Sequence, residues 1–600
     1  MAARPAPQMK YLDEDVFVTI TGLQRIFRSK ARSDLFPRWV LATIETVSTS
    51  RSRTFAVRPD AAWLRARRRL LRQLKSEVSR RMGREPTDVR AYTRRYEREL
   101  AKPWSVSDKR ELLAAVESAD IVFGGDFHAL GPAQRTHLKI LRSISEERPV
   151  TLCLECFSIA SQKWLDLYAA GKVTAEDLRK KSRWETEWGF PWENYRPLFE
   201  LARRRGWSLV ALNSSGGKTK QTARQLESRE KNAARVIVDR SRRAPDALVY
   251  VIFGDLHLAN SHLPAALMAR GFDGKKVTIH LNSERIYLDL ARRGLELGVD
   301  VVKFSPTQFC VLSSPPWVKW QSYLLFLDRT TDAGADEGLD DGSGDGSVEF
   351  DPTDQVARLA KLAALDLGVE LKVDDLGVYA DDESIWRSVE KSLRGSQREI
   401  ARYLLANGRS FFLPAGGVAY LSRTTVNHAA AVAGEYLHAR LSGRSRALWD
   451  FPRDFRSLVW TEAVAYFVSK LVNHKRQAET LTDLRAQLAA AGAGDDVRET
   501  LRLALDMSFS ELVWIRAKRK RGLRVRPRRR SSYVEASRIL GGMMGERLYL
   551  AFRSRRLKRE DLVSWMSHDP SSRRFADVYD DIVMRLASFG EISMPRKERL

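Results

Sequence analysis

The sequence contains few cysteines and no long apolar run. Cys153, Cys156 and Cys310 are the three cysteines among 600 residues, too few for the disulfide framework of a secreted scaffold. No apolar run approaches the roughly 18 residues that a membrane-spanning helix needs, and the first residues lack the apolar stretch of a secretory signal. These absences predict a protein without a transmembrane segment, located in the cytoplasm.

The composition is that of a globular protein with more than one domain. Hydrophobic residues make up 44% and charged residues 30% of the chain, and 600 residues exceed what a single core organises. Residues 331–350 contain seven acidic residues, five glycines and no Lys or Arg, which is typical of a flexible linker. We therefore predict a basic helical N-terminal region (1–115), an α/β domain (116–330), an acidic glycine-rich linker (331–352) and an all-α C-terminal domain (353–600). The oligomeric state stays open.

Short β-rich runs alternate with helical segments before the predicted linker. The runs are 121–123, 150–154, 209–212 and 249–253. Strands that alternate with helices predict a mainly parallel sheet with helices on both faces, that is, an α/β fold class. After the linker, helical periodicity covers 356–367, 384–405, 429–441 and 457–472.

The positive charge is concentrated in two windows. The net charge is +26, and residues 51–100 and 511–560 contribute +10 and +13 of it. The first window has the spacing of a basic amphipathic helix, and the second contains an arginine-rich stretch that predicts an exposed loop. Two interpretations stay open: both windows are solvated faces, or they make weak nonspecific contact with a polyanion such as nucleic acid or anionic lipid.

One phrase occurs twice in the central region, 129 residues apart. Residues 122–128 and 251–257 each place an apolar strand before Gly-Asp-apolar-His. In an open parallel sheet, ligands bind outside the carboxyl ends of the strands, where both phrases are expected to lie. The two phrases therefore indicate His128 and His257, with Asp126 and Asp255, as candidate site residues.

Two further strands are expected to end in polar groups, Glu155 and Asn213. Neutral imidazole suits zinc and iron, and two histidines with one carboxylate leave coordination positions open. His128, Glu155 and His257 are thus candidate metal ligands. The alternative is that each polar group only caps the following helix.

At these residues the sequence resembles the ChaN-like haem-binding family of the Tiki and erythromycin-esterase-like superfamily. The resemblance covers about residues 118–327. Its blocks include Gly125 to His128 with Gln134 and Leu138; Leu154 to Phe157; Gln162, Trp164 and Tyr168; Trp188; Tyr195 to Leu198; Val210 to Asn213; Arg229, Glu230, Ala233 and Ala234; and Gly254 to His257.

The resemblance implies an α/β/α domain in which His128, Glu155 and His257 line one pocket. The leading hypothesis is a protein that binds haem or an iron-like metal there, with His128, His257 or Tyr195 as axial ligand and Asn213 as a further contact. A macrocycle needs an aromatic wall, for which the sequence offers Trp164, Trp184, Trp188, Phe190 and Trp192.

Two other functions compete with haem binding. The first is a metal-dependent hydrolase, in which His128, His257 and Glu155 hold a divalent metal and Asp126 or Asp255 acts as general base. The second is a polyanion-binding adaptor that uses the two basic windows.

A weaker pattern lies in the C-terminal region. Glu435 and His438 stand three residues apart on an expected helix, and Glu462 belongs to another. Such motifs hold di-iron centres when the carboxylate set is complete. It is incomplete here, so we expect ordinary helix faces.

Overall fold

The computed structural model describes residues 56–83, 85–214, 222–335, 352–380, 385–492 and 496–590. Most of the predicted acidic linker, from 336 to 351, therefore lies outside the described residues, as does the start of the first basic window. None of the described helices combines the length and apolarity needed to span a membrane.

An eight-stranded sheet organises the α/β part, in the order β1-β7-β8-β6-β2-β5-β3-β4. The strands are β1 (Ser105–Ser107), β2 (Ile121–Asp126), β3 (Val150–Ser158), β4 (Ser208–Asn213), β5 (Leu248–Gly254), β6 (Lys276–Leu281), β7 (Val301–Ser305) and β8 (Gln308–Val311). All pairs from β8 to β4 are parallel, whereas β7 runs antiparallel to β8 and to β1. The predicted mainly parallel sheet is confirmed. Strands β1, β6, β7 and β8 were not among the expected runs.

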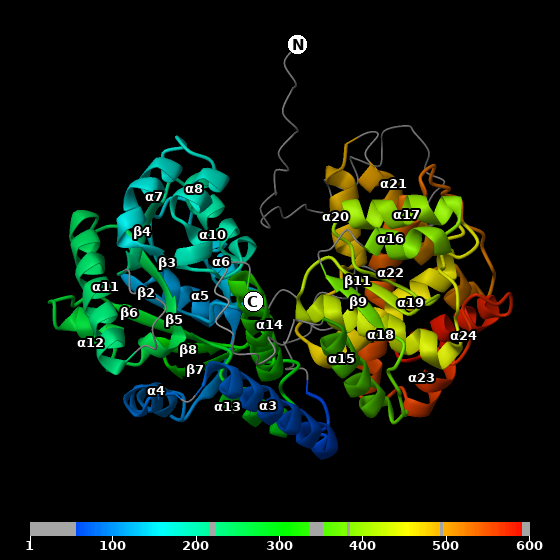
Figure 1. The fold of residues 1–600 in the computed structure, drawn as a ribbon, viewed down its shortest axis with the longest axis horizontal. Helices are drawn as coiled ribbons and strands as arrows, with labels where there is room; N and C mark the ends of the chain where they lie inside the picture. Colours follow the sequence, from blue (N-terminus) through cyan, green and yellow to red (C-terminus); the bar gives the residue numbers. More distant parts are fainter. Residues whose placement is uncertain are drawn as a thin grey trace, which may run out of the picture. The chain divides into compact units, whose positions relative to one another are not determined.

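Helices cover both faces of this sheet, because alternate residues of the strands enter different cores. Ile121 and Phe123 of β2 pack with α11 and α12, whereas Val122 packs with α5, α6 and α10. Figure 1 shows these two groups of helices around the sheet. The helices of this part are α5 (Lys109–Glu117), α6 (Gly131–Arg142), α7 (Gln162–Ala169), α8 (Ala175–Lys181), α9 (Trp184–Glu187), α10 (Trp192–Arg204), α11 (Ala223–Arg243), α12 (Leu263–Met268), α13 (Glu284–Arg293) and α14 (Pro316–Ala335).

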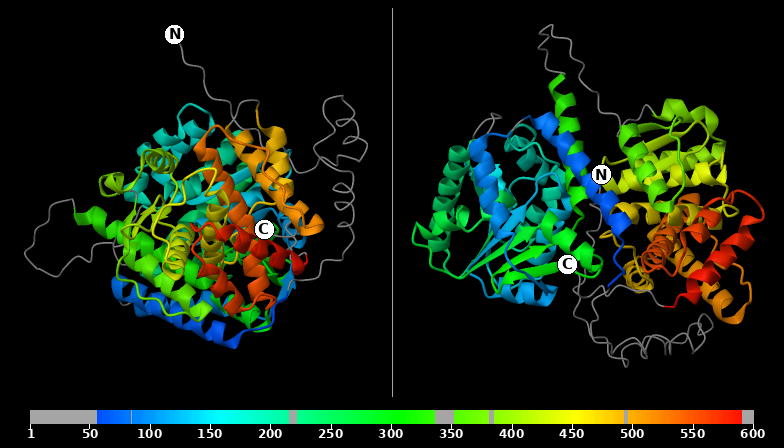
Figure 2. Two further views of the ribbon diagram at one scale, coloured as in Figure 1. Left: turned by 90° about the vertical axis from the view of Figure 1, so that its right-hand side faces the viewer. Right: turned by 90° about the horizontal axis from the view of Figure 1, so that it is seen from below.

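The first basic window forms two helices, α3 (Ala61–Met82) and α4 (Thr87–Glu99). Apolar residues of α3, among them Leu70 and Leu74, enter the large core. Helix α3 lies beside α14, as Figure 2 shows. Arg67 differs from the expected solvated face: its side chain is fully buried and forms an ion pair with Asp366. The predicted amphipathic helix is present, and one of its arginines belongs to the interior.

The C-terminal part is mostly helical. Its helices are α15 (Pro352–Leu367), α16 (Ile385–Val389), α17 (Gly395–Ala406), α18 (Val426–Ser442), α19 (Phe455–Val472), α20 (Leu481–Ala490), α21 (Asp496–Ala517), α22 (Arg530–Arg553), α23 (Arg559–Met566) and α24 (Phe575–Ser588). The description as all-α needs one correction: β9 (Gly377–Ala380), β10 (Phe411–Leu413) and β11 (Val418–Leu421) form a small sheet. These strands are three or four residues long, too short to give a clear alternating pattern among the helical segments on either side.

Candidate functional site

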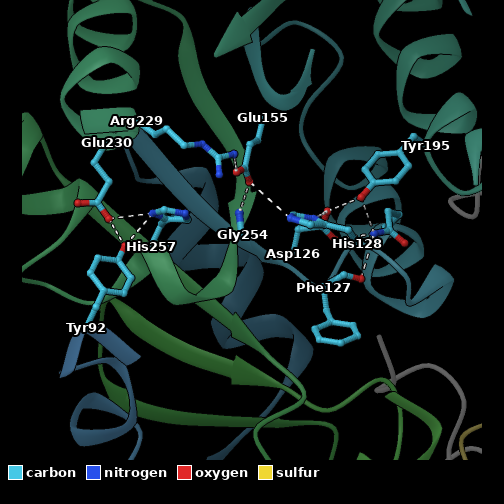
Figure 3. A network of polar contacts seen from close by, with 11 residues as sticks. Tyr92, Asp126, Phe127, His128, Glu155, Tyr195, Arg229, Glu230, Gly254 and His257 are labelled. Carbon is cyan, nitrogen blue, oxygen red and sulfur yellow. Dashed lines mark hydrogen bonds and ion pairs between the residues drawn. The ribbon is translucent and has the colours of Figure 1, made fainter. Parts of the chain in front are cut away.

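Three neighbouring strands bring the predicted ligands together. Strand β5 lies between β2 and β3, and Asp126 of β2 is in register with Gly254 of β5. A Cβ atom placed on Gly254 would stand 3.3 Å from Glu155 Oε2, 3.4 Å from His257 Cδ2 and 3.6 Å from His128 Cε1. The three side chains therefore surround one point at the carboxyl edge of the sheet, and a glycine keeps that point open (Figure 3).

His128 is held by the aspartate of its own phrase. Its Nδ1 atom lies 3.0 Å from Asp126 Oδ2, which also accepts a 2.6 Å hydrogen bond from the Tyr195 hydroxyl. Gln134 donates to the other oxygen of Asp126 at 2.5 Å. Burial opposes the charged imidazole, but the hydrogen bond and charge of Asp126, with the charge of Glu155, raise the pKa of His128 above its usual value. This anchoring leaves Nε2, 3.9 Å from Glu155 Oε2, as the nitrogen that faces the site.

The same contacts act on Asp126 in the opposite direction. Burial favours the protonated carboxyl, but the hydrogen bond and charge of His128 and the hydrogen bond from Tyr195 lower the pKa of Asp126. Tyr195 itself is 1% exposed. Its hydroxyl is therefore engaged in orienting the His128–Asp126 pair, which fits a supporting residue better than the predicted axial ligand.

His257 is held by a carboxylate from a different element. Its Nδ1 atom lies 2.8 Å from Glu230 Oε1 on α11, and the Tyr92 hydroxyl of α4 donates to the same oxygen. Burial lowers the pKa of His257 to about 4, so the imidazole is neutral near pH 7. A neutral imidazole that donates from Nδ1 carries its lone pair on Nε2, the form that binds a metal. Burial raises the pKa of Glu230 to about 7.

Glu155 has a partner at each oxygen. Arg229 donates to Oε1 at 2.5 Å, and the backbone N–H of Gly254 donates to Oε2 at 2.6 Å. In the described ranges no group of three or more His, Cys, Asp or Glu side chains has an arrangement that could hold a metal ion. Glu155, the carboxylate expected to complete a metal site with His128 and His257, is instead ion-paired with Arg229.

Asp255 and Asn213 lie apart from this arrangement. Asp255 accepts hydrogen bonds from the Leu281 N–H at 3.3 Å and from the Tyr96 hydroxyl, so it connects β5 to β6 and α4. Asn213 ends the edge strand β4, and its side chain makes no hydrogen bond to the site within the described residues. The two Gly-Asp-apolar-His phrases thus use their aspartates differently, which identical sequence patterns do not reveal.

An aromatic wall stands beside His128. The imidazole ring centroid lies 4.5 Å from that of Trp188 and 5.1 Å from that of Phe190. Phe190 stacks on Phe326 of α14 at 4.1 Å, and the wall continues through Tyr323, Phe127 and Trp320. All six rings are half-buried. The other expected rings lie elsewhere: Trp184 and Trp192 are in the core, and Trp164 packs against two lysines.

Sequence reasoning did not assign several of these roles. Arg229 and Glu230 stood in the blocks of the resemblance, but nothing indicated that one neutralises Glu155 and the other orients His257. Tyr92 and Phe326 come from the predicted N-terminal region and from the end of the α/β domain. One sequence feature could have indicated this role: Glu230 lies on the face of α11 that packs against the sheet, where its carboxylate can contact His257.

Residues 112–248 match the family model described as haem-binding uptake, Tiki superfamily, ChaN. The family model covers this segment and not the rest of the chain. The ChaN-like segment contains His128, Glu155, Tyr195 and the aromatic residues Trp188 and Phe190, whereas His257 and the rings of α14 follow it in the chain. The predicted resemblance is confirmed for these residues.

Two solved structures are similar to part of the chain. One is ChaN of Campylobacter jejuni with cofacially bound haem, which is 13% identical and matches 29% of this chain and 86% of its own with a TM-score of 0.23. The other is the type III effector HopBA1, which is 11% identical and matches 35% of this chain and 96% of its own with a TM-score of 0.25. No curated protein matches the sequence.

Proposed function

We propose that the carboxyl edge of the sheet binds haem, with His128 as the residue that holds the iron. One observation carries this proposal: the side chain of His128 is 25% exposed and stands directly against a wall of half-buried aromatic rings. Its Nδ1 atom is fixed by Asp126. Nε2 is then the coordinating atom, in the carboxylate–histidine arrangement common to protein-bound metals.

The residues around His128 fit the rest of a porphyrin. The faces of Trp188, Phe190 and Phe326 supply apolar contact for a flat macrocycle. Lys319 lies 4.5 Å above the ring of Phe127 and has no ion-pair partner within the described residues, so its ammonium group is available to a propionate. Bound haem would supply an iron centre at this edge, and the match of residues 112–248 to the ChaN family model supports that identity.

The geometry favours haem over a divalent metal held by three side chains. The predicted three-ligand metal site needs Glu155 free to coordinate, and Glu155 is instead paired with Arg229 and the Gly254 N–H. One accessible imidazole suffices for haem, whose remaining ligands are its own pyrrole nitrogens. The pairing of Glu155 therefore counts against the hydrolase hypothesis in its three-ligand form.

Titration of the full chain with haemin, followed by the Soret band, tests the proposal. We expect H128A to bind haemin at least about tenfold more weakly than wild type, since it removes the iron ligand. W188A should weaken binding through the macrocycle alone. The matched control is H568A, because His568 is an exposed histidine that follows α23 in the C-terminal part. Unchanged haemin affinity in H128A would refute His128 as the ligand, and H257A would then test the other imidazole.

We also infer weak polyanion binding by residues 518–529, because an extended segment there presents a row of arginines. Between α21 and α22 the exposure alternates: Arg524, Arg526 and Arg528 point outward, whereas Leu523 and Val525 pack against the C-terminal core. None of these three arginines has an ion-pair partner within the described residues. Such a row attracts phosphates without reading base sequence.

The cytoplasmic location stays a prediction. The three free, buried cysteines are compatible with it.

A further inference from the structure

Helix α14 carries two sets of residues with different surroundings. Trp320, Tyr323 and Phe326 belong to the aromatic wall beside the haem site. Trp317 and Leu324, seven residues apart and therefore on one side of the helix, are buried in the large core. This core also contains apolar residues of α15 and α18. Helix α14 therefore connects the wall to the C-terminal part of the chain.

The end of α19 receives hydrogen bonds from side chains of two other helices. The last four carbonyl groups of a helix have no partner within that helix. The carbonyl oxygen of Val472 accepts a 2.6 Å hydrogen bond from Nε1 of Trp317, and that of Leu471 accepts one from Arg67 at 3.0 Å. The guanidinium also supplies the positive charge that stabilises the C-terminal end of a helix. Helices α14 and α3 thus cap the end of α19.

The hydrogen bond of Trp317 fixes α14 because the indole has nowhere else to donate. Trp317 is fully buried. Its ring makes edge contacts with Trp63 of α3 at 5.8 Å and with Tyr287 of α13 at 5.3 Å. If α14 turned or slid away from Val472, the indole N–H would stay buried without an acceptor, which costs free energy. The bond therefore holds the rotation of α14 about its own axis.

That rotation decides whether the aromatic wall is complete. The ring of Phe326 stacks on that of Phe190, with centroids 4.1 Å apart and an angle of 19° between the rings. A side chain stands roughly 5–6 Å from the helix axis, so a rotation of α14 by about 20° would displace the Phe326 ring by about 2 Å. A displacement of this size removes much of the contact between stacked rings. The position of Phe326 thus depends on how α14 is held.

We propose that Trp317 is a positioning residue of the haem site: through its hydrogen bond to Val472, the C-terminal part holds α14 at the rotation that completes the aromatic wall. This inference rests on the haem proposal above and gives the C-terminal part a task in it. The sheet supplies the iron ligand His128, whereas the C-terminal part sets the place of Phe326 against the macrocycle. Haem affinity is then a joint property of both parts of the chain.

Titration of the full chain with haemin compares W317F with a matched control. W317F should bind haemin about fivefold more weakly than wild type. The Soret maximum of its bound haem should stay that of wild type, since His128 is unchanged. The control is W460F: Trp460 of α19 is also fully buried and also donates its indole N–H, but to His438 within the C-terminal part, at 3.2 Å. W460F should stay within about twofold of the wild-type affinity.

A double-mutant cycle tests whether Trp317 acts through Phe326. In the F326A background, W317F should lower haemin affinity by less than about twofold, because the ring that it positions is already absent. Unchanged affinity in W317F, an equal loss in W460F, or full additivity of W317F and F326A would each overturn the inference and leave the haem proposal standing. Absence of a Soret band in the wild-type chain would overturn both.

Hydrogen exchange provides a readout that does not need bound haem. In the chain without haemin, W317F should speed exchange of the amides of residues 320–327, and W460F should not; equal exchange in W317F and wild type would refute the positioning role. If W317F lacks a cooperative melt, the wild-type chain decides, since coupling between two sites is reciprocal. Haemin should then slow exchange at 469–475 as well as at 320–327. Slowing confined to 320–327 would overturn the inference.

Discussion

Replacement of Arg67 tests whether the basic helix α3 is a solvated surface or a structural tie to the C-terminal part. The guanidinium of Arg67 is fully buried. It donates to Asp366 of α15 through both terminal nitrogens and to the backbone oxygen of Leu471 in α19 at 3.0 Å. The guanidinium carbon also lies 5.4 Å from the ring of Trp63 and 5.7 Å from that of Trp317. One side chain thus contacts α3, α14, α15 and α19.

The size of the effect follows from what R67M would leave behind. Asp366, 9% exposed, would keep a buried charge without its partner, and the Leu471 oxygen would lose a donor. Removal of one member of a buried ion pair typically costs about 3–5 kcal/mol of unfolding free energy. The double variant R67M/D366L removes both charges, so it should recover most of that loss.

Urea denaturation of the full chain, followed by far-ultraviolet circular dichroism, measures this difference. The matched control is R72A, an exposed arginine of the same helix, for which we expect a change within about 0.5 kcal/mol. A change of less than about 1 kcal/mol in R67M would contradict the reasoning, because it would place Arg67 in solvent. Equal losses in R67M and R67M/D366L would show that packing, rather than the buried charge, dominates.

Two further predictions concern pH and salt. Burial lowers the pKa of His438 to about 3, well below its value in the unfolded chain. Between pH 7 and pH 5 the unfolded chain therefore binds a proton at His438 that the folded chain does not bind. Acidification over this range should lower the unfolding free energy by about 2 kcal/mol. H438Q should lack this part of the acid sensitivity in urea titrations at both pH values, and an identical pH dependence would contradict it. Replacement of Arg524, Arg526 and Arg528 by Gln should weaken binding of single-stranded DNA and flatten its salt dependence in fluorescence anisotropy, with no effect of base sequence. Binding that persists unchanged in this variant would assign the polyanion contact elsewhere.

The fold class and the location of the site could be predicted from the sequence because both depend on local patterns. Alternation of β-rich runs with helical segments indicates a parallel sheet. The repeated Gly-Asp-apolar-His phrase marks two strand ends, and strand ends of a parallel sheet share one edge. These patterns predicted that His128, Glu155 and His257 lie at one edge of the sheet.

The partners of those residues depend on tertiary contacts that leave no local pattern. Asp126 supports the histidine of its own phrase, whereas Asp255 pairs with the next strand and His257 takes Glu230 from a helix instead. Strand β3 continues past Glu155 to Ser158, so this carboxylate lies within a strand and meets Arg229 from α11. Two tetrapeptides of one pattern therefore have different surroundings.

The same distinction separates what composition determined from what packing decided for the charged and aromatic residues. Helical spacing predicted an amphipathic helix in the first basic window, but only the packing of α15 and α19 made Arg67 a buried partner of Asp366. The haem hypothesis named Trp188 and Phe190 for an aromatic wall. Phe127, Tyr323 and Phe326 join this wall only through the packing of α14. Periodicity is a property of neighbouring residues and can be read locally, whereas desolvation and ion pairing depend on which distant surfaces meet.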